Sequence, residues 1–165
     1  MATVNETIEV NAPIDMVYNQ WTQFEEFPTF MEGVESVKQL DDTRLLWVAE
    51  IAGKRHEWEA KITEQKPDSV IAWMATDGKE NGGRVLFQDL GSSRTRIDVE
   101  MKYETEGLVE NLGSKLGADD RRVSGDLERF KELIERRGVE SGAWRGEVEA
   151  GQVTNWPLRR TASST

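Results

Sequence analysis

The chain has 165 residues, a formal net charge of −10 at pH 7 and no cysteine. This length suits one domain with a single hydrophobic core. The negative charge argues against nucleic acid or an anionic membrane surface as a partner, and the missing cysteine excludes disulfides and thiolate chemistry. No stretch is long and apolar enough to span a membrane, and the first residues do not resemble a secretory signal. We therefore expect a cytoplasmic protein.

The first 31 residues predict one strand followed by two short helices. Residues 3–10 alternate, with Val4, Ile8 and Val10 on one side, which is typical of a half-buried strand. Pro13 suits the first turn of a helix, where a missing N–H costs nothing, and we expect helices over 13–22 and 25–31. The second helix carries a dense aromatic group that indicates core and that could also close one end of a pocket: Phe24, Phe27 and Phe30.

Residues 34–104 predict six consecutive strands. Turn signals such as Ala52-Gly53 and Pro67-Asp68 separate them, and the short links favour an antiparallel meander. With the first strand, the predicted sheet has seven strands. The six expected here span 34–40, 44–51, 54–65, 70–76, 83–89 and 94–104.

The alternation within these strands gives the sheet one dry face. In the third of them, His56, Trp58 and Ile62 share one side, whereas charged residues occupy the other. A sheet with one charged, solvated face needs a cover for its other face. The cover is the stretch 108–137, because its apolar residues keep helical phase over its whole length.

The first half of this long helix is weaker than the second. Gly113 and Gly117 each disfavour helix by about 1 kcal/mol relative to alanine. Either the helix bends near Gly117, or a firm helix begins at Asp119, and Gly138 ends it. Beyond that residue periodicity is lost. We expect a domain over 1–138 and a flexible tail over 139–165.

Several parts of the sequence carry a family resemblance: residues 8–18, Trp21, and residues 24–30, 33–37, 57–62, 71–73, 83–87 and 127–135. They resemble polyketide cyclase/dehydrase-like and coenzyme-Q-binding proteins of the START/Bet v 1-like (SRPBCC) superfamily, over about residues 4–137. The resemblance implies an α+β helix-grip fold, in which a seven-stranded antiparallel sheet wraps around a long C-terminal helix, with two short helices after the first strand and a hydrophobic cavity. It does not fix a function, because this superfamily uses one cavity for lipid binding, hormone binding, aromatic cyclisation and chaperone-like roles.

Parity selects the side chains that would line such a cavity. Three indoles lie on neighbouring strands: Trp47, Trp58 and Trp73. They either bind a flat ligand or pack on one another. His56, the only histidine, could act as a general base or could lie at the sheet rim in solvent. Tyr103 could hold a polar ligand head or could be core. The predicted lining is Trp47, His56, Trp58, Trp73, Phe87, Met101, Tyr103, Leu116, Val123 and Phe130.

Several site classes are excluded. One histidine without cysteine does not make a usual zinc site, and Gly82-Gly83 is a hairpin signal rather than a phosphate loop. We expect no cofactor and no metal.

The leading hypothesis is non-catalytic binding of a small hydrophobic molecule, such as a polyketide, quinone or lipid. One alternative is an aromatase/cyclase-type enzyme in which His56 or Tyr103 moves protons. Another is a protein-interaction or stress-related module that uses the acidic surface and the tail.

Overall fold

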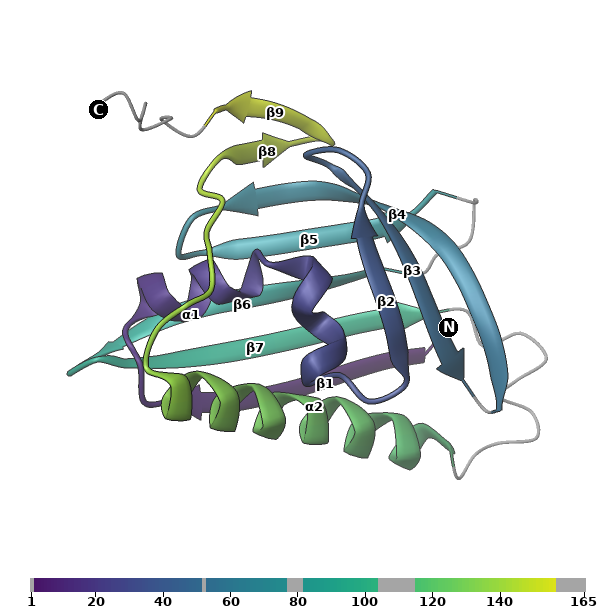
Figure 1. Cartoon of the computed structure of the whole chain (residues 1–165), viewed down its shortest axis with the longest axis horizontal. Coiled ribbons are helices and arrows are strands. Elements are labelled where there is room, and N and C mark those ends of the chain that lie inside the picture. Colours follow the sequence, from purple (N-terminus) through teal and green to yellow (C-terminus); the bar gives the residue numbers. More distant parts are fainter. Residues whose placement is uncertain (1, 52, 77–81, 104–114, 157–165) are drawn as a thin grey trace.

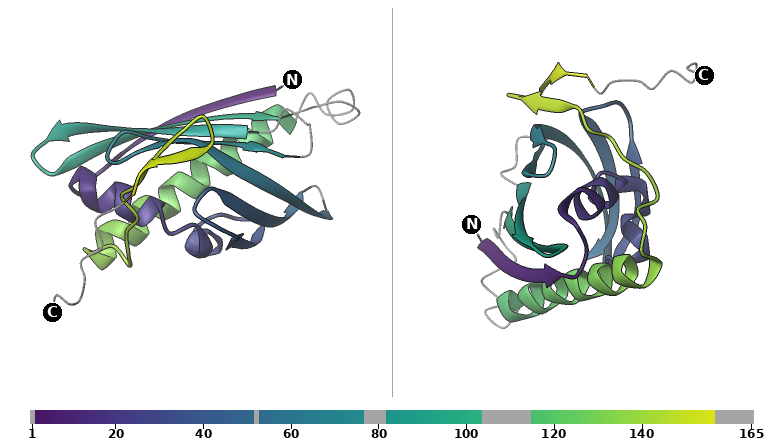
Figure 2. Two further views of the ribbon diagram at one scale, coloured as in Figure 1. Left: turned by 90° about the horizontal axis from the view of Figure 1, so that it is seen from above. Right: turned by 90° about the vertical axis from the view of Figure 1, so that its left-hand side faces the viewer.

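The computed structural model describes residues 2–51, 53–76, 82–103 and 115–156, with the backbone alone described for residues 2, 51, 103 and 115–120. A curved antiparallel sheet holds a short helix in its concave side, and a long helix lies along one edge (Figures 1 and 2). The elements in chain order are β1 (Ala2–Val10), α1 (Ile14–Trp21), the 3₁₀ helix η1 (Phe24–Thr29), β2 (Val34–Gln39), β3 (Arg44–Ile51), β4 (Lys54–Lys66), β5 (Val70–Ala75), β6 (Gly82–Gly91), β7 (Arg94–Tyr103), α2 (Lys115–Arg137), β8 (Glu147–Glu149) and β9 (Gln152–Asn155).

The sheet order is β1-β7-β6-β5-β4-β3-β2, and every neighbouring pair is antiparallel. The predicted meander from β2 to β7 is confirmed, and β1 completes it by pairing with β7. The predicted α+β class with a large antiparallel sheet and a C-terminal helix is also confirmed. The strand count differs, because the described residues form nine strands instead of seven.

The two short elements after β1 close one end of the concave side. Helix α1 begins directly after Pro13 and buries Val17, Tyr18 and Trp21. The second element is a 3₁₀ helix with Pro28 inside it, since a proline lacks the N–H that an α-helix requires at that point. The aromatic side chains predicted to be core are indeed buried in both elements.

Helix α2 packs its apolar stripe against the concave side, beside β1 (Figure 2). Leu127, Phe130 and Ile134 are buried, as the helical phase predicted, and burial of each contributes about 1.5–3 kcal/mol. The helix begins at Lys115, so Asp119 lies inside it and does not mark its start. Residues 108–114 of the predicted helix lie outside the described residues.

The segment after α2 corrects the sequence prediction of a flexible tail. Strands β8 and β9 form a hairpin, whose turn residues Ala150 and Gly151 both have positive φ, as two-residue hairpin turns require. Strand β8 pairs with β4 and places Val148 opposite Gln65. The prediction is wrong over 139–156 because an alternation of only three residues, 147–149, gives too short a pattern to recognise. Residues 157–165 lie outside the described part of the chain.

We predict that Val148→Ala lowers the free energy of unfolding by about 2 kcal/mol, because this side chain is fully buried in the core cluster. Val139→Ala is the matched control, since Val139 is 54% exposed, and it should change stability by less than about 0.5 kcal/mol. Urea denaturation followed by tryptophan fluorescence measures both. Equal, small effects would show that the hairpin does not pack as described.

Candidate functional site

One half of the space between the sheet and α2 is filled by aromatic side chains. Trp21 lies at the centre, with its ring centroid 4.7 Å from that of Phe130, 5.7 Å from Phe30 and 6.3 Å from Phe87. All four side chains are buried, and such tilted ring contacts are typical of a close-packed core. Phe87 and Phe130, which the sequence predicts as cavity lining, therefore pack within this aromatic cluster.

Beyond this cluster, large apolar side chains on β4, β5, β7 and α2 are only partly buried. They pack against the core cluster, yet each retains exposed surface. Apolar side chains that stay partly accessible beside a buried core are a common feature of a binding site for an apolar ligand. These four side chains, here called the inner patch, are Trp58, Trp73, Met101 and Val123.

Strand register aligns part of the inner patch in one row. Trp73 lies opposite Ile62 on one side and opposite Gly83 on the other, and Gly83 lies opposite Met101. Directly opposed residues share a face of the sheet. Because Ile62 is fully buried in the core, the whole row faces the concave side.

Gly83 allows the Trp73 side chain to approach the backbone of β6 closely. A Cβ atom built on Gly83 would stand 2.5 Å from Cζ2 of Trp73, so the indole lies over the glycine. A glycine inside a strand often marks such a close approach. Sequence reasoning missed this role and treated Gly82-Gly83 as a hairpin signal. The sequence did contain a signal: Gly83 is the first residue of the predicted strand 83–89, and a glycine within a strand often marks a close approach of a neighbouring group.

Trp47 and Trp58 form a second flat surface on β3 and β4. Their rings are nearly parallel, at 5°, with centroids 5.9 Å apart, because the register places the two residues opposite each other. Trp47 is 7% exposed, and its indole Nε1 finds no hydrogen-bond partner among the described residues. A buried donor without a partner costs about 1–3 kcal/mol. Because this atom is itself buried, a ligand oxygen would reach it only after the indole turns.

The remaining predicted site residues lie at the ends of their elements. His56 has the predicted inward parity, opposite Ala49, but it is exposed near the outer end of β4. Tyr103 is the last residue of β7, and Leu116 lies in the first turn of α2. The side chains of Tyr103 and Leu116 lie outside the described residues, so their roles stay predictions.

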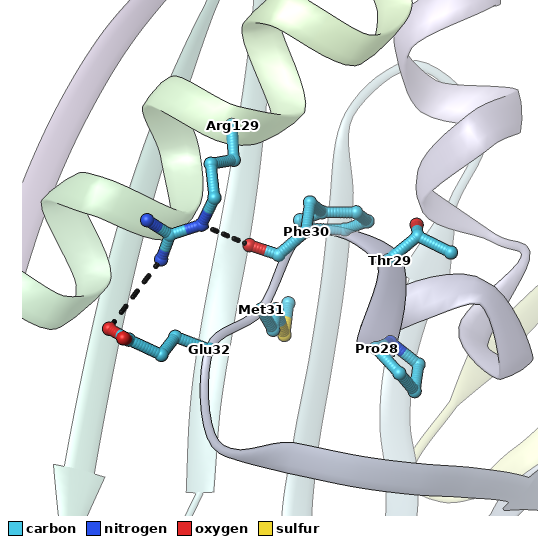
Figure 3. Close-up of a pocket in the computed structure, with 6 residues that line it drawn as sticks. All are labelled: Pro28, Thr29, Phe30, Met31, Glu32 and Arg129. Carbon is cyan, nitrogen blue, oxygen red and sulfur yellow. Dashed lines mark hydrogen bonds and ion pairs between the residues drawn. The ribbon is translucent and has the colours of Figure 1, made fainter.

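A small surface pocket of about 280 Å³ lies between η1 and α2 (Figure 3). Arg129 donates from Nε to the carbonyl oxygen of Phe30 at 2.9 Å, and its Nη2 pairs with Asp126 and with Glu32. Burial raises the pKa of Asp126, although Arg129 and the Glu32 amide counteract it. The guanidinium is thus already neutralised. This pocket is smaller than most ligand pockets. The contacts of Arg129 that line it join the segment after η1 to α2.

The described residues offer neither a metal-binding cluster nor a membrane-spanning helix. Within the described ranges, no group of three or more histidine, aspartate or glutamate side chains is arranged to hold a metal ion. No described helix is long and apolar enough to cross a membrane.

The sequence and the fold both match known proteins. Residues 10–132 match the family model described as polyketide cyclase / dehydrase and lipid transport, and the chain belongs to this family. It is 46% identical over 149 residues to an uncharacterised 17.2 kDa protein of Streptomyces lincolnensis, which covers 90% of this chain and 99% of the relative.

Solved structures share the fold at lower identity. The Zhui aromatase/cyclase of a Streptomyces species aligns with a TM-score of 0.69 and 20% identity, over 86% of this chain and 98% of that one. A START superfamily protein of Mycobacterium smegmatis aligns with a TM-score of 0.67 and 17% identity, over 80% and 98%. The predicted START-like fold and the predicted family are therefore confirmed.

We predict that Gly83→Val displaces the Trp73 indole and lowers the free energy of unfolding by about 1–3 kcal/mol, because the new side chain occupies the space of the ring. Tryptophan emission should shift to the red as the indole gains solvent contact. The neighbouring Arg84→Val is the control, since Arg84 is exposed on the opposite face. An unshifted spectrum for Gly83→Val would contradict the close packing.

Proposed function

We propose that this protein binds a small hydrophobic molecule on the concave face of its sheet, in the half away from α1. The observation that carries the proposal is the inner patch: Trp58, Trp73, Met101 and Val123 remain partly exposed although they pack against the buried core between the sheet and α2. Covering them with an apolar ligand would contribute about 25 cal/mol for each Å² removed from water.

The shape of the patch favours a flat ligand. The Trp73 indole lies over Gly83, and the stacked Trp47 and Trp58 rings add a second flat surface. Met101 can adapt to ligands of different outline. A polyketide or quinone with one oxygen aimed at Trp47 Nε1 would suit these groups. A lipid chain would use the patch but not the donor.

Simple binding is favoured over catalysis by the chemistry of the patch. Its four side chains hold no group that titrates near neutral pH, and the only histidine is exposed at the outer end of β4. The aromatic cluster around Trp21 also restricts a ligand to one half of the sheet–helix space. We place the protein in the cytoplasm, in keeping with its composition.

We predict that wild-type protein binds the neutral dye N-phenyl-1-naphthylamine saturably, with energy transfer from tryptophan. Met101→Gln should weaken this binding about ten-fold, because a buried amide without a partner costs more than 1 kcal/mol. Leu86→Gln makes the same kind of change on an exposed, 39% accessible side chain outside the core cluster and should leave affinity unchanged. Equal effects of both variants, or no saturable binding, would refute the proposed function.

The second candidate is an aromatase/cyclase, favoured by membership of a family described as polyketide cyclase/dehydrase. Its proton-transfer groups would be His56 and Tyr103. If the protein only binds, His56→Ala and Tyr103→Phe should leave the product distribution from a poly-β-ketone substrate identical to that of wild type. A changed distribution with either variant, in protein that still binds the dye, would favour catalysis.

A further inference from the structure

Residues 137–151 form a strap that runs from the end of α2 past α1 to the β8–β9 turn (Figure 1). Its far end is fixed to the sheet, because the Gly151 amide donates to the Thr63 carbonyl oxygen at 3.1 Å and Val148 is buried. The family model ends at residue 132, so the strap lies outside it. The match to the Streptomyces lincolnensis protein spans 149 of the 165 residues and therefore reaches at least residue 149, wherever it begins.

The side of α1 that faces the strap is polar, although it is buried. Asn19, Gln20 and Thr22 are all buried, and buried amides and hydroxyls are destabilising unless they are hydrogen-bonded. The strap supplies those bonds. Gln20 Oε1 accepts from Ser141 N at 2.8 Å, and Thr22 Oγ1 accepts from Trp144 N at 3.1 Å.

Arg145 is the central contact of the strap. Its Nη1 donates to Asn19 Oδ1 at 2.6 Å, and its Nη2 donates to Asp68 Oδ2 at 2.7 Å. The guanidinium also lies over the Tyr18 ring, 5.5 Å from the centroid. Burial raises the pKa of Tyr18 to about 12, so this ring stays neutral. One side chain thus joins α1 to the β4–β5 turn.

The contacts between the strap and α1 are weaker than the apolar contacts on the opposite side of α1. The opposite face of α1 is apolar, and Trp21 is the centre of the aromatic cluster, so its removal from the core would expose large apolar area. The strap contacts α1 through hydrogen bonds and through Arg145, whose ion pair with Asp68 is partly exposed, while its apolar side chains Trp144 and Val148 pack against the core. Water can replace each hydrogen bond at a net cost of about 0.5–1.5 kcal/mol. Opening movements begin where such exchangeable contacts gather.

We propose that Arg145 is a latch that holds α1 against the sheet, and that its release lowers the barrier to a transient outward movement of α1 that lets a ligand pass. This inference rests on the proposed hydrophobic binding. While the latch is closed, the aromatic cluster keeps half of the compartment filled. When it opens, the compartment enlarges, and the rate of opening sets how fast a ligand enters and leaves.

The test compares full-length wild type, Arg145→Ala and Arg145→Lys by hydrogen exchange and by stopped-flow dye binding. In Arg145→Ala, exchange of the α1 amides 17–22 should rise about ten-fold, while amides of β6 and β7 keep their wild-type rates. Arg145→Lys should show a smaller rise than Arg145→Ala. The lysine ammonium keeps the positive charge and one contact, but it does not reproduce both contacts of the guanidinium. Arg94→Ala, which removes an exposed ion pair with Glu9, is the control and should change neither region.

The dye arm uses N-phenyl-1-naphthylamine. Entry and exit rates should rise together in Arg145→Ala, with the dissociation constant changed less than about three-fold, because a latch alters the barrier and not the bound state. Exchange in α1 equal to wild type, or raised equally in β6 and β7, would overturn the latch. Faster α1 exchange with unchanged dye rates would overturn its control of ligand passage. If wild type does not bind the dye, the proposed function fails, and the exchange data alone still decide whether Arg145 restrains α1.

Discussion

The structure depends on one constraint: a curved sheet with one charged face must keep its other face away from water. Seven strands in one meander produce a concave surface that is too large for one helix to cover. Helix α2 covers the side next to β1, and α1 with η1 closes one end through the aromatic cluster around Trp21. The inner patch lies beyond that cluster, where Trp58, Trp73 and Met101 of the sheet and Val123 of α2 are not completely covered by any described element.

The contrast between the two sides of α1 links packing to function. Its inner side is fixed by apolar contacts, which water does not replace, whereas its outer side is fixed by hydrogen bonds from the strap, which water does replace. The proposed binding requires a rigid surface and at least one element that can move. In that proposal the sheet, with Trp73 lying over Gly83, is the rigid surface, and α1, whose outer side is held by polar contacts, is the element that moves.

The chemistry of the concave face also limits what the family membership implies. The described inner patch consists of indoles, a thioether and an aliphatic side chain, so it offers shape and apolar area rather than acids and bases. Shape alone can guide a reactive chain, but proton transfer would need His56 or Tyr103 from the ends of β4 and β7. Among the described residues, the buried side-chain donor that lacks a partner is Trp47 Nε1, and an indole N–H does not act as an acid or base near neutral pH.

The sequence by itself determined the meander, the dry face and the buried stripe of α2, because periods of 2 and 3.6 residues report directly on which side of an element is apolar. Only the tertiary structure decided which of the inward residues are filled core, such as Phe87 and Phe130, and which remain accessible. It alone revealed Gly83 under Trp73 and Arg145 on α1, since both depend on contacts between residues at least ten positions apart. Local patterns contain no information on such contacts, and a three-residue strand such as β8 is recognised only by its partner.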